Sequence, residues 1–131
     1  MIYANVAGMH ILLVEDSDEV SCITVEYLRE LNHSVAAVPD AEQALNRLKE
    51  EPFDALMTDV RLPGMSGLDL ARTVSSDYPN LPVVISSGYG SLQVEYLVGE
   101  KQLENVLMLP KPYDLEELEK TLKNAAALAG R

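Results

Sequence analysis

Acidic residues stand directly after two of the apolar runs in this sequence. Glu15 and Asp16 follow Ile11–Val14, and Asp59 follows Ala55–Thr58. Three carboxylates that meet in one cleft repel one another unless a cation lies between them. Oxygen ligands suit Mg²⁺, which in proteins takes one or two carboxylates and keeps several waters. The three residues therefore predict a magnesium site, provided that the fold brings them together.

Two further apolar runs are followed by groups that could bind a phosphoryl group. Ser86 and Ser87 come after the run at 82–85, and Lys111 comes shortly after the run at 106–109. A hydroxyl and an ammonium are groups that can stabilise the equatorial oxygens of a transferred phosphoryl group. These residues therefore predict that a phosphoryl group is bound on the far side of the acidic cluster.

The acidic cluster also contains a candidate nucleophile. A carboxylate can attack a phosphoryl group and become an acyl phosphate. Asp59 is the natural candidate because it follows a central strand, which leaves Glu15 and Asp16 as metal ligands. An aspartyl-nucleophile phosphohydrolase would need a second acid two residues after the nucleophile, and Arg61 stands there instead.

Apolar runs and helical patterns alternate along the chain, which predicts an α/β fold. Five short runs rich in leucine and β-branched residues lie at 11–14, 34–38, 55–58, 82–85 and 106–109. Five helices between and after them give a (βα)₅ doubly wound parallel sheet, with right-handed crossovers and a flavodoxin-like strand order, 2-1-3-4-5. All strand carboxyl ends then share one edge, and ligands bind at the switch point between strands one and three.

Local signals mark the ends of the predicted helices. Ser17 or Asp18 caps the first helix, Asn32 suits its left-handed exit, and Asp40 and Asp114 cap the second and last helices. The first helix carries one apolar stripe, typical of a helix that packs on a core: Val20, Ile23, Thr24, Tyr27, Leu28 and Leu31. A weaker stripe predicts a fourth helix within residues 91–102.

Length and composition fit a single domain. The chain has 131 residues, 47% of them hydrophobic, and we expect an N-terminal extension at 1–8 and one domain at 9–131. A net charge of −11 argues against binding to nucleic acid or to anionic membranes. One cysteine excludes an internal disulfide, and no apolar run approaches the roughly 20 residues of a membrane span. We therefore expect a cytoplasmic protein.

Four motifs at the strand ends resemble the receiver domains of bacterial two-component response regulators. They are LVED at 13–16, TDVRLPGMSG at 58–67, PVVISSGY at 82–89 and LPKPY at 109–113. The resemblance covers about residues 9 to 128. The segments SSGYG and LPKPYD are also similar to receivers attached to sensor histidine kinases.

The resemblance implies a role for each residue of the cluster. Asp59 would be the phosphoacceptor, and Mg²⁺ would bind Asp16, Asp59 and the backbone carbonyl of Arg61. Glu15 would act on the metal through a bound water, and Lys111, in a cis bond to the next residue, would contact the phosphoryl group.

The resemblance also implies a hydroxyl residue that moves toward the phosphoryl group, called the switch hydroxyl below. It is expected to be Ser87, with Ser86 as the second choice. Met108 stands where the family often has Tyr or Phe, so we expect only weak coupling between that position and the hydroxyl.

The resemblance also implies partners. A sensor histidine kinase or a histidine phosphotransfer protein would donate the phosphoryl group, and a downstream protein partner would read the result. No DNA-binding or catalytic output segment is expected within this chain. The alternative is a pseudo-receiver, an interaction module that keeps the fold without phosphorylation.

Overall fold

The computed structural model describes residues 8–88 and 103–130 of the chain. Five parallel strands form one sheet in the order β2-β1-β3-β4-β5, which confirms the predicted doubly wound, flavodoxin-like fold. The strands are β1 (His10–Val14), β2 (Ser34–Val38), β3 (Ala55–Asp59), β4 (Val83–Ser87) and β5 (Val106–Pro110). The described helices are α1 (Asp18–Glu30), α2 (Ala41–Glu50), α3 (Gly67–Asp77) and α5 (Leu115–Leu128). The helix predicted within 91–102 lies outside the described residues.

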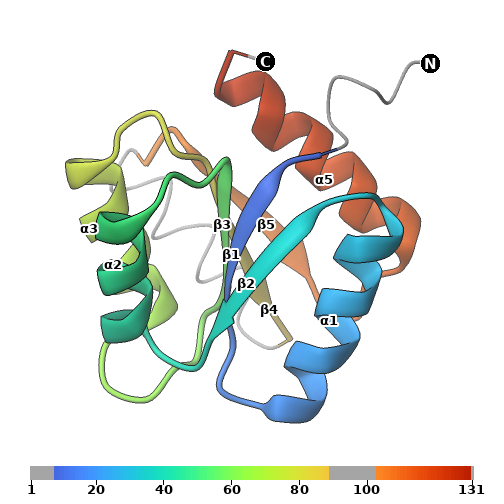
Figure 1. The fold of residues 1–131 in the computed structure, drawn as a ribbon, viewed down its shortest axis with the longest axis horizontal. Helices are drawn as coiled ribbons and strands as arrows, with labels where there is room; N and C mark the ends of the chain where they lie inside the picture. The colour runs from blue at the N-terminus through green and yellow to red at the C-terminus, as the bar shows by residue number, and fades with distance from the viewer. Residues whose placement is uncertain (1–7, 89–102, 131) are drawn as a thin grey trace.

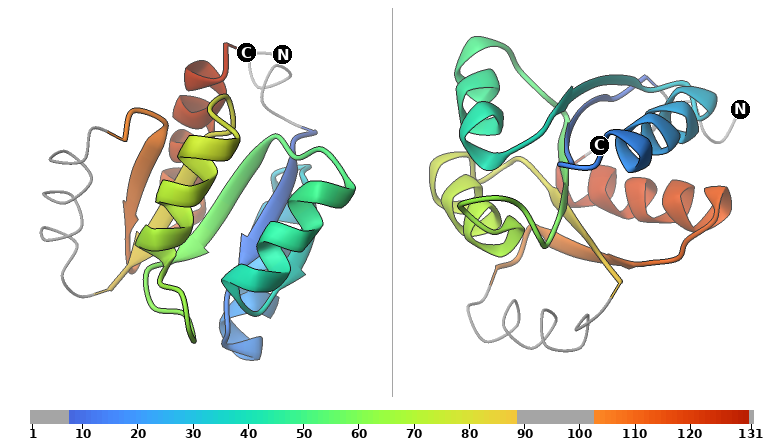
Figure 2. Two further views of the ribbon diagram at one scale, coloured as in Figure 1. Left: turned by 90° about the vertical axis from the view of Figure 1, so that its left-hand side faces the viewer. Right: turned by 90° about the horizontal axis from the view of Figure 1, so that it is seen from below.

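The helices form a layer on each side of the sheet. Helices α1 and α5 cover one face, and α2 and α3 cover the other (Figures 1 and 2). Successive residues of a strand point to opposite faces. In β1, Ile11 and Leu13 accordingly join the core under α1 and α5, whereas Leu12 and Val14 join the core under α2 and α3. Burial of both faces explains why the strands read as continuous apolar runs.

The helix ends follow the predicted signals. Ser17, rather than Asp18, caps α1, because its hydroxyl accepts a hydrogen bond from the Val20 N–H. Asn32 leaves that helix with a φ of 70°. The side chain of Asp40 caps α2, and Asp114 caps α5 within a full capping box. None of the described helices has the length and apolarity needed to cross a membrane.

Two details of the sequence interpretation were wrong. Ser86 and Ser87 do not follow β4 but belong to it, and Asp59 belongs to β3, because the strand pairing continues through Asp59–Ser86 and Ser87–Pro110. The hydrogen-bonded ladder therefore runs up to the predicted site rather than ending short of it.

The apolar stripe of α1 is not wholly buried either. Val20 and Ile23 are 36% and 53% exposed, whereas Thr24 and Leu28 are buried. Helix α1 begins after β1 has ended, so its first turns project past the carboxyl edge of the sheet, at the bottom of Figure 1. Among the described residues, no strand extends as far as these first turns, so the sheet leaves Val20 and Ile23 uncovered.

This difference in burial predicts that truncating a buried leucine and an exposed isoleucine to alanine will lower the free energy of unfolding by different amounts. Leu56→Ala, at a fully buried position of β3, should lower the free energy of unfolding by about 2–5 kcal/mol, because it leaves a cavity in the core. Ile23→Ala, at an exposed position, should change it by no more than about 0.5 kcal/mol. Urea unfolding followed by circular dichroism measures both. Equal losses would contradict the described packing of α1.

Candidate functional site

Three carboxylates converge at the carboxyl edge of the sheet, as the sequence predicts. Glu15 and Asp16 follow β1, and Asp59 is the last residue of the neighbouring β3. One carboxylate oxygen from each of the three lies within 4.8 Å of the others. Glu15 is buried, Asp59 is half-buried and Asp16 is exposed. The cluster therefore has a buried wall and an open side, and it is called the acidic pocket below.

A lysine from a more distant strand completes the acidic pocket. Lys111 follows β5, and its Nζ lies 3.8 Å from Glu15 Oε1 and 3.7 Å from Asp59 Oδ2. Its backbone N–H donates to the Ser87 carbonyl at 2.9 Å, and its bond to Pro112 is cis, as predicted. One ammonium thus faces two carboxylates from the far side of β4.

Burial is the largest influence on the pKa of the Glu15 carboxyl. Desolvation raises the pKa of Glu15 above its usual range, and the nearby charge of Asp59 raises it further. A hydrogen bond from the Ser17 N–H, at 3.1 Å from Oε2, and the charge of Lys111 lower the pKa without cancelling the effect of burial. Glu15 is therefore harder to ionise in the folded chain than in water.

The donor atoms of the acidic pocket suit a hard divalent cation. All three side chains offer carboxylate oxygen, which is the ligand type that Mg²⁺ prefers, and the exposed Asp16 leaves room for water. Arg61 lies two residues beyond the end of β3, and its side chain is exposed. The role of the Arg61 carbonyl as a ligand stays a prediction.

Both candidate hydroxyls lie at this edge of the sheet. Ser86 is paired with Asp59 across the β3–β4 ladder, and its buried Oγ has no hydrogen-bond partner among the described residues. Ser87, also buried, lies one residue further along the strand. Which of the two serves as the switch hydroxyl stays a prediction.

An apolar groove beside the acidic pocket was missed from the sequence. It holds about 680 Å³ and is lined by Val20, Ile23, Thr24, Tyr27, Gly88, Lys111, Pro112 and Tyr113. Burial raises the pKa of the Tyr113 hydroxyl, and a hydrogen bond with Thr24 lowers it in part. Periodicity assigns Val20 and Ile23 to a buried stripe, so no sequence signal showed that these side chains would instead line an open surface.

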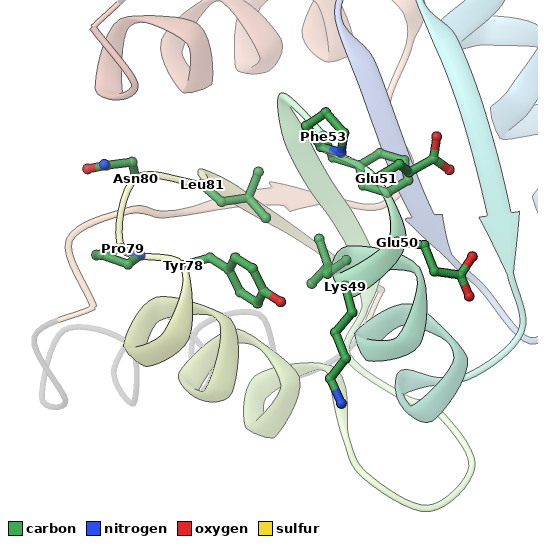
Figure 3. Close-up of a pocket in the computed structure, with 10 residues that line it drawn as sticks. Lys49, Glu50, Glu51, Phe53, Tyr78, Pro79, Asn80 and Leu81 are labelled. Carbon is green, nitrogen blue, oxygen red and sulfur yellow. The ribbon is translucent and has the colours of Figure 1, made fainter.

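A second hollow, of about 580 Å³, lies away from these residues. It is formed where α2 and α3 end, with Phe53, Tyr78 and Leu81 on its walls (Figure 3). The amine of Lys49 and the carboxylate of Glu50 extend to its side rather than converging in it (Figure 3). This hollow has none of the predicted site residues, so it offers no alternative place for the phosphoryl chemistry.

Comparisons with known proteins agree on one family. The family model of the response regulator receiver domain matches residues 11–123. The chain is 40% identical over 116 residues to the two-component response regulator PhoP of Pseudomonas aeruginosa, a match that covers 87% of this chain and 50% of PhoP. The chain therefore spans half the length of that relative.

Solved structures of related proteins share the fold. The chemotaxis protein CheY4 of Vibrio cholerae is 26% identical, with a TM-score of 0.80 over 91% of this chain and 99% of CheY4. A sensor protein from Polaromonas sp. JS666 is also 26% identical, with a TM-score of 0.83 over 91% of this chain and 96% of the other. The chain belongs to the family of response regulator receiver domains of two-component systems.

The raised pKa of Glu15 predicts how its removal changes stability with pH. Burial disfavours the ionised form of Glu15 in the folded chain but not in the unfolded chain. The contribution of Glu15 to folding stability is therefore largest at low pH and is lost as the pH rises through the folded-state pKa. Glu15→Gln, without divalent cations, should therefore be more stable than the wild type at neutral pH. The gain should shrink as the pH falls toward 4.5.

Glu51 provides a control of opposite sign. A hydrogen bond from Arg47 lowers the pKa of Glu51, so ionised Glu51 stabilises the fold and that contribution is lost as the pH falls below 4.5. Glu51→Gln should be less stable than the wild type at neutral pH and should approach it in acid. Urea titrations across the pH range measure both variants, and a loss of stability in Glu15→Gln at neutral pH would contradict the account of burial.

Proposed function

We propose that this receiver domain is a phosphoacceptor switch in a two-component phosphorelay. Asp59 takes a phosphoryl group from a phosphohistidine on a sensor histidine kinase or a histidine phosphotransfer protein, with Mg²⁺ as cofactor. The modified domain then changes its binding to a downstream protein partner in the cytoplasm. The observation that carries the proposal is the convergence of Glu15, Asp16, Asp59 and the Lys111 ammonium at one edge of the sheet.

The chemical step is a transfer between two side chains. A carboxylate oxygen of Asp59 attacks the phosphorus, the P–N bond to the donor histidine breaks, and its electron pair stays on the imidazole nitrogen. Asp16, Asp59 and the Arg61 carbonyl would hold the Mg²⁺, and Glu15 would act on it through water. Bound Mg²⁺ supplies positive charge that offsets the charge of the carboxylates and of the transferring group.

Lys111 serves the phosphorylated state. In the unmodified chain its ammonium is shared between Glu15 and Asp59. A phosphoryl group on Asp59 brings additional negative charge and acceptor oxygens to this place. The ammonium then moves to a phosphoryl oxygen, which it can reach without leaving the acidic pocket.

Ser87 carries the signal away from Asp59. Its hydroxyl donates to a phosphoryl oxygen and draws the end of β4 inward. Met108, which is half-buried against the core under α2 and α3, couples weakly to this movement because an unbranched side chain fills space in several rotamers.

Phosphorylation itself is tested with a small phosphodonor. Incubation with acetyl phosphate and Mg²⁺ should add one phosphoryl group to the wild-type chain, seen by intact-mass spectrometry. Asp59→Asn should gain none, because the nucleophile is gone, and EDTA should abolish the gain in the wild type. Asp69→Asn, at an exposed carboxylate of α3, is the matched control and should be phosphorylated normally. An unmodified wild-type chain would favour the pseudo-receiver.

Replacement of Lys111 should separate signalling from folding. Lys111→Ala removes a partly exposed ammonium at the sheet edge and leaves no core cavity, so the free energy of unfolding should change by about 1 kcal/mol or less. The response to phosphorylation, measured as amide shifts with a beryllofluoride phosphate mimic, should be impaired. Lys120→Ala on the exposed side of α5 is the control. A large loss of stability with a normal response would reverse the assigned role.

A further inference from the structure

The backbone carbonyl of Asp59 is enclosed from two sides. Thr58 is fully buried, and its Oγ1 donates a hydrogen bond to this carbonyl oxygen at 2.9 Å. On another side lies Gly67, the first residue of α3. A Cβ at Gly67 would stand 2.0 Å from the Asp59 carbonyl oxygen and 2.9 Å from its carbonyl carbon. Only a residue without a side chain allows this close approach.

The same contact closes the segment that follows the phosphoacceptor. The N–H of Gly67 donates to the Val60 carbonyl at 2.8 Å, so the chain that leaves the sheet at Asp59 returns to it eight residues later. Gly64, inside this segment, differs in kind. It has a φ of +76°, and no atom lies within 4 Å of the place where a Cβ would stand. Gly64 is therefore required by the left-handed turn and not by a close contact.

The peptide unit between Asp59 and Val60 is consequently held at both ends. Its carbonyl meets the Thr58 hydroxyl and Gly67, and its N–H donates to the Ser86 carbonyl at 3.2 Å. Because a peptide unit is planar and rigid, fixing its two polar groups fixes its orientation. The Cα of Asp59, which carries the carboxylate, is attached to that plane.

We propose that Thr58 and Gly67 are positioning residues that form a clamp on the Asp59 carbonyl. The clamp sets the direction of the Asp59 carboxylate and of the chain that leads to Arg61, so that both can meet one divalent cation. The inference rests on the proposed function for the identity of that cation. Outer-shell partners that hydrogen-bond to metal ligands commonly change metal affinity or activity 10–100-fold when they are replaced, which sets the scale expected for the clamp.

The hydroxyl half of the clamp is tested by Thr58→Val, which keeps the shape and removes the donor. The affinity for Mg²⁺, measured by calorimetry on the full chain, should fall about tenfold. Phosphoryl uptake from acetyl phosphate should slow at a fixed, sub-saturating Mg²⁺ concentration. The matched control is Thr121→Val in α5, which removes a hydroxyl-to-carbonyl bond of the same 2.9 Å length. It should bind Mg²⁺ as the wild type does.

The glycine half is tested by Gly67→Ala, with Gly64→Ala as its control. Gly67→Ala should weaken Mg²⁺ binding at least as much as Thr58→Val and should shift the backbone amide signals of Val60 and Arg61. Gly64→Ala strains a left-handed turn but leaves the contact between Gly67 and Asp59 intact. It should therefore weaken Mg²⁺ binding less than Gly67→Ala does. If Gly67→Ala does not fold, the comparison of Thr58→Val with Thr121→Val still decides.

The outcomes separate the clamp from the proposed function. The clamp would be overturned if Thr58→Val bound Mg²⁺ as tightly as the wild type, or if Thr58→Val and Thr121→Val lost Mg²⁺ affinity equally. Either result would count even if Asp59 is phosphorylated. A wild type that binds Mg²⁺ but gains no phosphoryl group would overturn the proposed function, and the clamp would still be judged by the affinities. A wild type that binds no Mg²⁺ would overturn both.

Discussion

The gathering of the carboxylates of Glu15, Asp16 and Asp59 at one edge of the sheet, with Glu15 buried, is the constraint on which the rest of this structure depends. Their oxygens lie within 4.8 Å of one another, and Lys111 offers a single ammonium almost 4 Å away. Burial keeps the pKa of Glu15 raised despite that ammonium. The pocket therefore costs stability in the unmodified chain, and added positive charge would recover it.

The sheet makes this concentration of charge possible. Its order places β1 beside β3 and carries Lys111 in from β5, on the far side of β4. Apolar layers under α1 with α5, and under α2 with α3, hold the strands from both faces. Core packing thus fixes where the strands end. The polar residues at those ends are not needed for core packing, so they can serve the chemistry of the site.

The sequence predicts the features that depend on local or topological rules. Helix caps at Asp40 and Asp114, the strand order and the convergence of the three acids all follow from such rules. Exposure of Ile23 does not, because periodicity cannot show where the sheet stops covering a helix. The approach of Gly67 to Asp59 does not follow from such rules either, since it depends on how a loop closes in three dimensions.

The most direct test of this account is the dependence of folding stability on Mg²⁺. If the acidic pocket binds the cation only when folded, the free energy of unfolding of the wild type should rise with the logarithm of the Mg²⁺ concentration, by about 2.7 kcal/mol at one hundred times the dissociation constant. Asp16→Asn should lose most of this rise, with ionic strength held constant by NaCl. An equal rise in Asp16→Asn, or none in the wild type, would contradict the account.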